Sequence, residues 1–180
     1  MIPARRKSKL RIFLLLFAAV CFLGLGRDRI WEIFGPADLG PVDFATLIRR
    51  ATPNDALVCT ASLCQARSDV EAPIFAEPVM VLRSAFDEVI TSEPRITRVA
   101  TDDAALSTRY VQRSAVMHFP DTIDVRLAAL PGGRSTILLY SRSKIGTSDV
   151  GVNRARLLRW LGKLGITAAV PMPSSPASPP

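Results

Sequence analysis

The densest group of side chains that could do chemistry lies near the end of the chain, at residues 141–156. This run reads Ser-Arg-Ser-Lys-Ile-Gly-Thr-Ser-Asp-Val-Gly-Val-Asn-Arg-Ala-Arg. An apolar stretch, Ile137 to Tyr140, precedes it and predicts a buried strand, and leucines at helical spacing from Leu157 to Leu164 predict a helix after it. The run therefore connects a strand to the N-terminus of a helix, where free N–H groups and a nearby arginine can bind an anion.

Two interpretations of this run remain open. In the first the run is structural: its short polar side chains cap the last helix, and Arg142 or Arg154 pairs with Asp149 to hold the loop. In the second it is a site for a ligand or a partner. The candidate binding residues are Arg142, Ser148, Asp149, Asn153 and Arg154. We assign no catalytic residue among them.

The pattern Ser-Arg-Ser-x-x-Gly-x-Ser-Asp-x-Gly-x-Asn-Arg-x-Arg, at residues 141–156, resembles the signature of a bacterial and plastid family catalogued as domain of unknown function 1499. Further matches are Pro53-Asn54-Asp55 followed by two cysteines, and Arg113-Ser114 followed by Phe119-Pro120-Asp121. Pro120 replaces the first of two adjacent acids that many members carry. The resemblance covers roughly residues 53–164 and implies a domain boundary, but no activity.

Catalysis is the alternative to binding. His118 is the only histidine, and with Asp121 and a serine it could form a hydrolytic triad. An envelope enzyme of the hydrolase type would use Asp149 or His118. No nucleophile-elbow pattern, phosphate loop, dinucleotide fingerprint or metal-ligand spacing is present. We therefore favour a non-catalytic binding or structural module, without a cofactor or a metal.

Charged residues also recur along the predicted strands. The basic ones are Arg109, Arg113, Arg126 and Arg142, and Asp121, Asp124 and Asp149 are close to them in sequence. An arginine that points inward must be paired, because an unpaired buried charge is costly. Pairing with an acid is one interpretation, and binding of an anionic headgroup or a carboxylate is the other.

Cys59 and Cys64 lie close together in Cys-Thr-Ala-Ser-Leu-Cys. A disulfide between them would close a small loop and stabilise the fold by about 2 kcal/mol. Zinc is a poor alternative, because a structural zinc site needs four ligands. A redox motif would have two intervening residues rather than four. A disulfide is our prediction, with two free thiols as the alternative.

The N-terminal segment predicts a membrane anchor. A basic cluster at residues 5–11 precedes residues 10–26, whose only charge is Arg11. This length is short for a bilayer span of about 20 residues and long for a signal-peptide core of about 7–15 residues. A single-pass anchor, a cleaved signal and lipidation of Cys21 therefore all remain open. The basic flank should stay in the cytoplasm, which places the domain in the periplasm of a bacterium and the anchor in its inner membrane.

The net charge of +7 is concentrated in the N-terminal tail. Residues 1–29 have a balance of +6, whereas the remainder carries 16 basic and 15 acidic residues. A nucleic-acid-binding domain needs a basic face on its folded part, so we exclude nucleic acid as a partner. The expected partners are the membrane, through residues 10–26, and an unknown protein or a small anionic ligand.

A helix, four strands and a second helix must position these residues. Pro78 to Ser92 predicts an amphipathic helix. The strand-like runs are Arg95–Ala100, Leu106–His118, Thr122–Leu130 and Arg134–Ser143. Short connections imply an antiparallel meander, and both helices must cover its apolar face. The predicted fold class is α+β, a four-stranded antiparallel meander with an N-terminal and a C-terminal helix, plus an N-terminal transmembrane helix.

The chain divides into four parts. They are a basic tail with an anchor or signal at 1–29, a linker at 30–52 with a short helix at 44–50, the α+β domain at 53–165, and a Pro/Ser-rich disordered tail at 166–180. In the linker, residues 30–34 are predicted to continue the helix to the membrane interface, with Trp31 as an aromatic anchor.

Overall fold

The computed structural model describes residues 11–19, 26, 30–165 and 168–169. Its centre is the predicted meander. Strands β4 (Ile96–Asp102), β5 (Ser107–Arg113), β6 (Pro120–Leu130) and β7 (Arg134–Ser143) pair antiparallel in that order, and η2 (Pro131–Gly133) connects the last two. β5 ends earlier than the predicted strand, because Ser114 and Phe119 close a loop: each backbone N–H donates to the other residue, at 3.0 Å.

The sheet is larger than the predicted four strands, so that part of the prediction is wrong. β1 (Asp55–Cys59) pairs antiparallel with β7, and β2 (Val70–Glu71) lies parallel to β1. β3 (Ile74–Phe75) pairs with β7 and with β8 (Ala168–Ala169), which gives eight strands among the described residues. β1 lacks alternation because four of its five residues are buried, and two-residue strands carry no periodicity.

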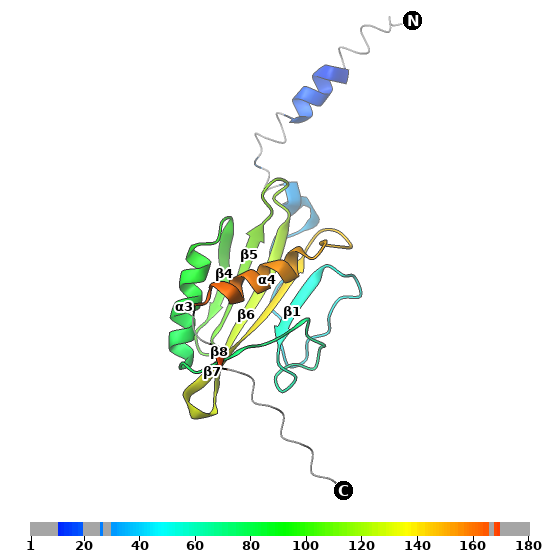
Figure 1. Cartoon of the computed structure of the whole chain (residues 1–180). Helices are drawn as coiled ribbons and strands as arrows, with labels where there is room; N and C mark the ends of the chain where they lie inside the picture. The colour runs from blue at the N-terminus through cyan, green and yellow to red at the C-terminus, as the bar shows by residue number, and fades with distance from the viewer. Residues whose placement is uncertain (1–10, 20–25, 27–29, 166–167, 170–180) are drawn as a thin grey trace, which may run out of the picture.

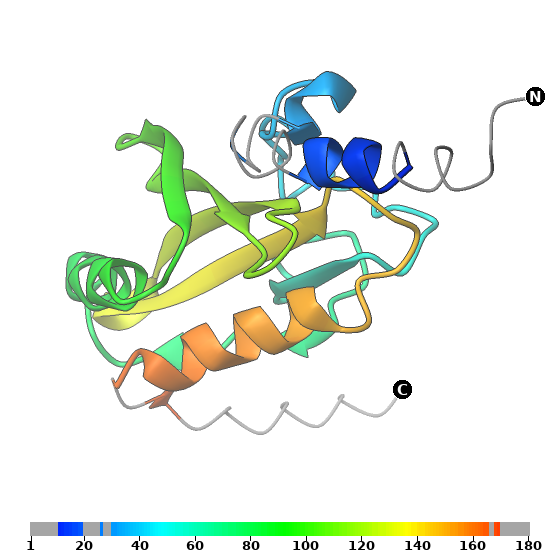
Figure 2. The same cartoon turned by 90° about the horizontal axis from the view of Figure 1, so that it is seen from above.

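Both predicted helices are present, and they cover one face of the sheet (Figures 1 and 2). α3 spans Val79–Thr91 and α4 spans Val152–Lys163. Phe86 of α3 and Trp160 of α4 meet edge to face, with ring centroids 5.8 Å apart. They pack onto inward-facing sheet residues such as Ile123 and Leu139, which are fully buried. The α+β class of the prediction is therefore confirmed.

An irregular segment, residues 36–47, lies on the other face of the sheet. Its Phe44 and Leu47 pack with Leu57, Leu138 and Tyr140 in a second, smaller core. The predicted helix at 44–50 is absent, and residues 44–46 form a turn instead. Asp43 accounts for this turn: its carboxylate accepts hydrogen bonds from the Ala45 N–H and the Thr46 hydroxyl, both at 3.0 Å.

Before this segment, residues 11–19 are helical and η1 (Trp31–Phe34) is a single 3₁₀ turn that ends at Gly35, where φ is 93°. None of the helices in the described part of the chain is long and apolar enough to span a bilayer. Residues 10 and 20–25 of the predicted anchor lie outside the described residues, as does the predicted tail apart from the residues of β8.

Cys59, at the end of β1, forms a disulfide with Cys64, which confirms the predicted pair. The bridge closes the loop that leads from β1 to β2. Both cysteines are buried in the smaller core beside Leu57 and Leu138. The disulfide therefore fixes the start of the β1–β2 loop against the smaller core.

Reduction of the Cys59–Cys64 disulfide should lower the free energy of unfolding by about 2 kcal/mol, because the unfolded chain regains the freedom of a short closed loop. Urea denaturation of the full chain with and without a thiol reductant measures this difference. In the variant Cys59→Ala/Cys64→Ala the reductant should have no effect, whereas Cys21→Ser should behave like the wild type. Equal stability of the oxidised and reduced wild type would contradict the prediction.

Candidate functional site

Asn153, a member of the predicted site, is completely buried at the start of α4. Its Nδ2 donates to the Asn54 carbonyl at 3.1 Å and to Ser143 Oγ at 2.9 Å. Its Oδ1 accepts from Ser141 Oγ and from Arg156 Nη1, both at 2.6 Å. All the polar atoms of this side chain are therefore used to join α4 to β7 and to the turn before β1.

Arg156 lies one helical turn further along α4 and pairs with Asp121 of β6 at 2.6 Å. Only 5% of the arginine side chain and 9% of the aspartate side chain are exposed. Arg156 also donates to Ser141 Oγ at 2.7 Å. Asp121 is the single acid left after Pro120 in the middle motif, and its role is to neutralise a buried charge.

Asp149 caps α4 from the preceding loop. Its two carboxylate oxygens accept from the backbone N–H groups of Gly151, at 3.0 Å, and Asn153, at 2.7 Å. Gly151 has φ 80°, a conformation that glycine adopts without a steric penalty. Asp149 therefore caps the helix, as the structural interpretation of the run predicts. Both of its carboxylate oxygens accept hydrogen bonds from the backbone.

The five predicted site residues do not converge on one point. Asn153 is buried and Asp149 caps the helix, whereas Ser148 and Arg154 are exposed. Arg142 lies on the opposite face of the sheet, because its neighbours Ser141 and Ser143 both contact Asn153 and side chains alternate along a strand. The contacts of the terminal run therefore mainly join the last helix to the sheet.

On that opposite face, basic side chains hold the irregular segment 36–47 against the strands. Arg109 of β5 makes a two-point contact with Asp38, at 2.7 and 2.8 Å. Arg142 of β7 donates to the Gly40 carbonyl and pairs with Asp124 of β6 at 3.2 Å. Arg142 pairs with Asp124 rather than with Asp149, and the inward-facing arginines find the acidic partners that burial requires.

Burial raises the pKa of Asp124 to about 6, although the charges of Arg142 and Arg109 oppose this shift. Burial also lowers the pKa of Arg142. The two side chains are only 8% and 11% exposed. Desolvation outweighs the attraction of the neighbouring charges, so the Asp124 carboxyl accepts a proton far more readily than an aspartate in water.

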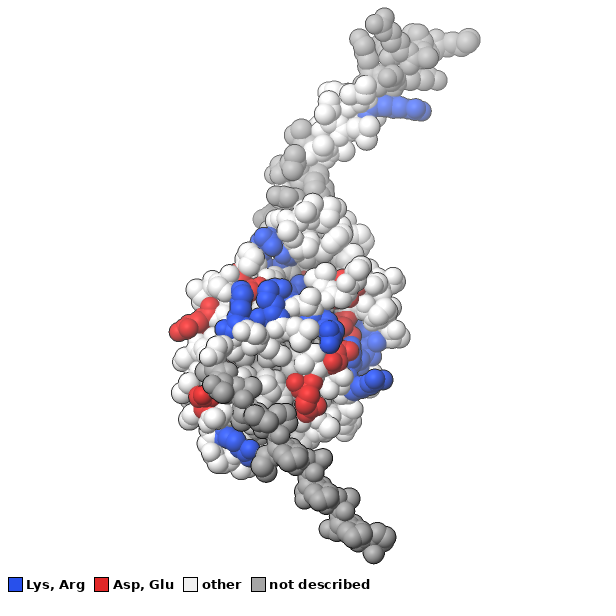
Figure 3. Space-filling model, viewed as in Figure 1, with Lys and Arg blue, Asp and Glu red and all other residues white. Residues whose placement is uncertain are grey.

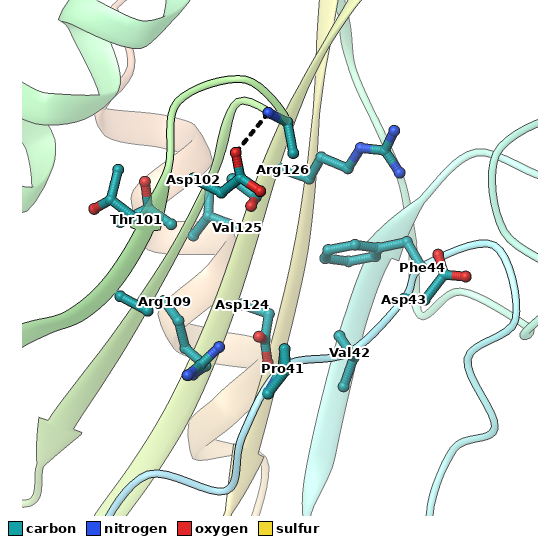
Figure 4. A pocket seen from close by; sticks show the side chains of 14 residues that line it. Pro41, Val42, Asp43, Phe44, Thr101, Asp102, Arg109, Asp124, Val125 and Arg126 are labelled. Atoms are coloured by element: carbon teal, nitrogen blue, oxygen red, sulfur yellow. Dashed lines mark hydrogen bonds between the residues drawn. The ribbon is translucent and has the colours of Figure 1, made fainter.

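A pocket of about 390 Å³ opens between the irregular segment and strands β4–β6. Figure 4 shows that its side chains come from three separate parts of the chain. Those that bear on its chemistry are Asp43, Phe44, Asp102, Arg109, Asp124 and Arg126. Sequence reasoning missed the pocket as a site, although it noted the arginines of β5 and β6, because nothing in the sequence shows that residues 41–44 cross these strands.

Most charged groups of the pocket already have partners within the protein. Asp43 accepts from Ala45 and Thr46, and Asp102 accepts from the Ala105 N–H at 3.0 Å. Arg109 and Asp124 belong to the pairs described above. Arg126 is different: its side chain is exposed and makes no hydrogen bond or ion pair with any residue that the structure describes. It is the cation that remains available to a ligand.

The residues considered for catalysis are not assembled into a triad. Asp121, the acid that His118 would need, is paired with Arg156. His118 lies in the loop after β5 with φ 56°. Within the described residues, no three His, Cys, Asp or Glu side chains are grouped so that they could hold a metal ion.

Residues 49–164 match a family described as "Protein of unknown function (DUF1499)". The match spans more than half of the chain and includes β1, the meander and α4. The chain therefore belongs to this family, as the resemblance of residues 141–156 indicated. A search of curated proteins found no match.

Replacement of Arg156 by leucine should lower the free energy of unfolding by about 3–5 kcal/mol, because Asp121 would remain buried without its partner. Arg154→Leu is the matched control: it lies two residues earlier on the same helix and is exposed, so it should change stability by less than about 0.5 kcal/mol. Chemical denaturation measures both values. Similar values for the two variants would show that the buried pair does not stabilise the fold.

Asp124 should titrate with a midpoint near pH 6, measurable from its carboxyl carbon shift by NMR. Because its pKa is raised in the folded state, its contribution to stability is complete below pH 3.8 and is lost as the pH rises through about 6. Between pH 4.5 and 6.5 the wild type should therefore lose stability relative to Asp124→Asn. A midpoint near 4, or parallel stability curves, would contradict this prediction.

Proposed function

We propose that this chain is a non-catalytic binding module of the bacterial envelope, which takes a small ligand with an anionic group in the pocket between residues 41–44 and strands β4–β6. The observation that carries the proposal is Arg126, whose exposed side chain has no partner among the described residues, at a pocket whose other charged side chains are engaged within the protein. The pocket volume of about 390 Å³ lies within the range of about 300–1,000 Å³ for small-molecule sites.

Arg126 recognises the anion in this proposal. It extends from β6 on the side of the pocket where Phe44 lies (Figure 4). Of the acids that line the pocket, Asp124 is paired with Arg142, whereas Asp43 and Asp102 accept hydrogen bonds from neighbouring neutral groups, so none of the three is bound to Arg126. A guanidinium binds carboxylates and phosphates through parallel N–H donors. The ligand is therefore a small carboxylate or phosphate compound.

Binding is favoured over catalysis by the role of Asp149. An acid or a base must exchange a proton with a substrate, whereas this carboxylate accepts two backbone hydrogen bonds that begin α4. Of the two residues that an envelope hydrolase would use, Asp149 is thus committed to the fold.

The envelope placement rests on the sequence. Residues 10–26 serve as a single-pass anchor in the inner membrane, and the basic cluster before them keeps the N-terminus in the cytoplasm. The domain then lies in the periplasm. The Cys59–Cys64 disulfide supports this proposal, because such bonds persist in oxidising compartments.

Titration of the full chain in detergent micelles with inorganic phosphate, and separately with acetate, should give saturable amide NMR shifts at residues 41–44 and in β5 and β6. Arg126→Gln should abolish these shifts because it removes the available cation. Arg154→Gln is the matched control, since it removes another exposed arginine that lies outside the pocket. Loss of binding in Arg154→Gln alone would move the site to the terminal run, and binding that survives Arg126→Gln would refute the pocket.

A further inference from the structure

η1 meets the β5–β6 loop at one end of the domain (Figure 1). Apolar side chains are exposed at this end. They come from two distant segments. Ile33 and Phe34 of η1 are 77% and 63% exposed, and Val116 and Met117 of the loop are 71% and 38% exposed. We call these four side chains the apolar end. Figure 3 shows that this end is mostly uncharged on the visible face, with Lys and Arg side chains below it.

The two segments of the apolar end are fixed to each other. Trp31 Nε1 donates to the Met117 carbonyl at 2.6 Å, and its ring lies against Phe119 with centroids 4.5 Å apart. Lys144, just after β7, donates to the carbonyls of Gly35 and Pro36. η1 is therefore held to the sheet and to the loop rather than suspended from a flexible linker.

We infer that the apolar end docks onto the lipid bilayer that holds residues 10–26; this inference rests on the proposed anchor. The short connection between the anchor and η1 favours this docking. Only residues 27–29 separate the apolar segment from Ile30, and the four steps from residue 26 to Ile30 span at most about 14 Å. A domain whose first turn is fixed to its β5–β6 loop must then bring that loop to the membrane surface.

The chemistry of the apolar end fits the boundary between headgroups and acyl chains. The four apolar side chains lose unfavourable contact with water there. Tryptophan, whose ring is apolar and whose N–H is polar, is enriched at this depth. Glu32, the acid of η1, interacts electrostatically with Lys144. Docking through two segments, rather than one, would set the orientation of the domain on the membrane.

A single-thiol label tests this inference on the full chain. In a Cys21→Ser background the disulfide leaves no free cysteine, so Val116→Cys can carry one environment-sensitive fluorophore. Met80→Cys is the control: it is 57% exposed, and it lies at the start of α3, near the end of the sheet where the β6–β7 hairpin lies. Both are reconstituted into phosphatidylcholine/phosphatidylglycerol vesicles.

The label at Val116 should shift to the blue, be quenched by a lipid with a nitroxide on its acyl chain, and lose several-fold in quenching by aqueous iodide relative to the label at Met80. Ile33→Cys, from the other segment, should give the same result, so a folding defect in one variant does not decide the test. Flotation of the vesicles reports separately whether the chain is held by the membrane.

The outcomes separate the two proposals. A chain that fails to float with the vesicles overturns the anchor and the docking together. A chain that floats but leaves both labels at the apolar end open to iodide overturns the docking alone. Labels that are protected from iodide and also from the nitroxide lipid would mean that a protein surface, such as a second copy of the chain, covers the apolar end, which also overturns the inference.

Discussion

The buried ion pair between Arg156 and Asp121 is the constraint on which the helical face of the domain depends. Removing a guanidinium and a carboxylate from water is costly, and the cost is offset only where the pair is close and its other polar atoms are satisfied. Here Ser141 Oγ and Asn153 Oδ1 both accept from the Nη1 group of Arg156, beside the Nη2 contact with Asp121. The register of α4 on β6 and β7 follows from this requirement, since a shift of one residue along the helix would leave the charge unpaired.

This requirement explains why the terminal run is so rich in special residue types. A guanidinium has five donors and no acceptor, so the surrounding chain must provide acceptors in a closed space. Asn153 then needs donors and acceptors of its own, which the Asn54 carbonyl and Ser143 supply, and Asp149 begins the helix that carries both residues. The part of the polar signature that faces α4 is thus the consequence of one buried charge.

The sequence was sufficient to predict the helices and strands that have clear apolar periodicity. It was insufficient to predict those without such periodicity. α3 and the meander could be predicted because apolar residues recur at the periods of a helix or a strand. β1 could not be predicted in this way, because both its faces are buried. The pocket could not be predicted either, because its walls come from segments that are distant in the sequence. One available signal was overlooked: Asn153 and Arg156 lie on the same side of α4 as Leu157 and Trp160, all four being buried. Polar residues on an apolar helical face indicate a buried network rather than an exposed site.

The face of the sheet opposite the helices is covered in a different way. Residues 36–54 contain no helix or strand, so the position of this segment depends on side chains of the sheet that hold it: Arg109 binds Asp38, and Arg142 donates to the Gly40 carbonyl. The pocket wall begins at the next residue, Pro41. Arg142 is itself paired with Asp124, whose pKa of about 6 makes that pair sensitive to pH. One irregular segment therefore connects η1 to the pocket, and the charge pairs beneath it hold the wall of that pocket in place.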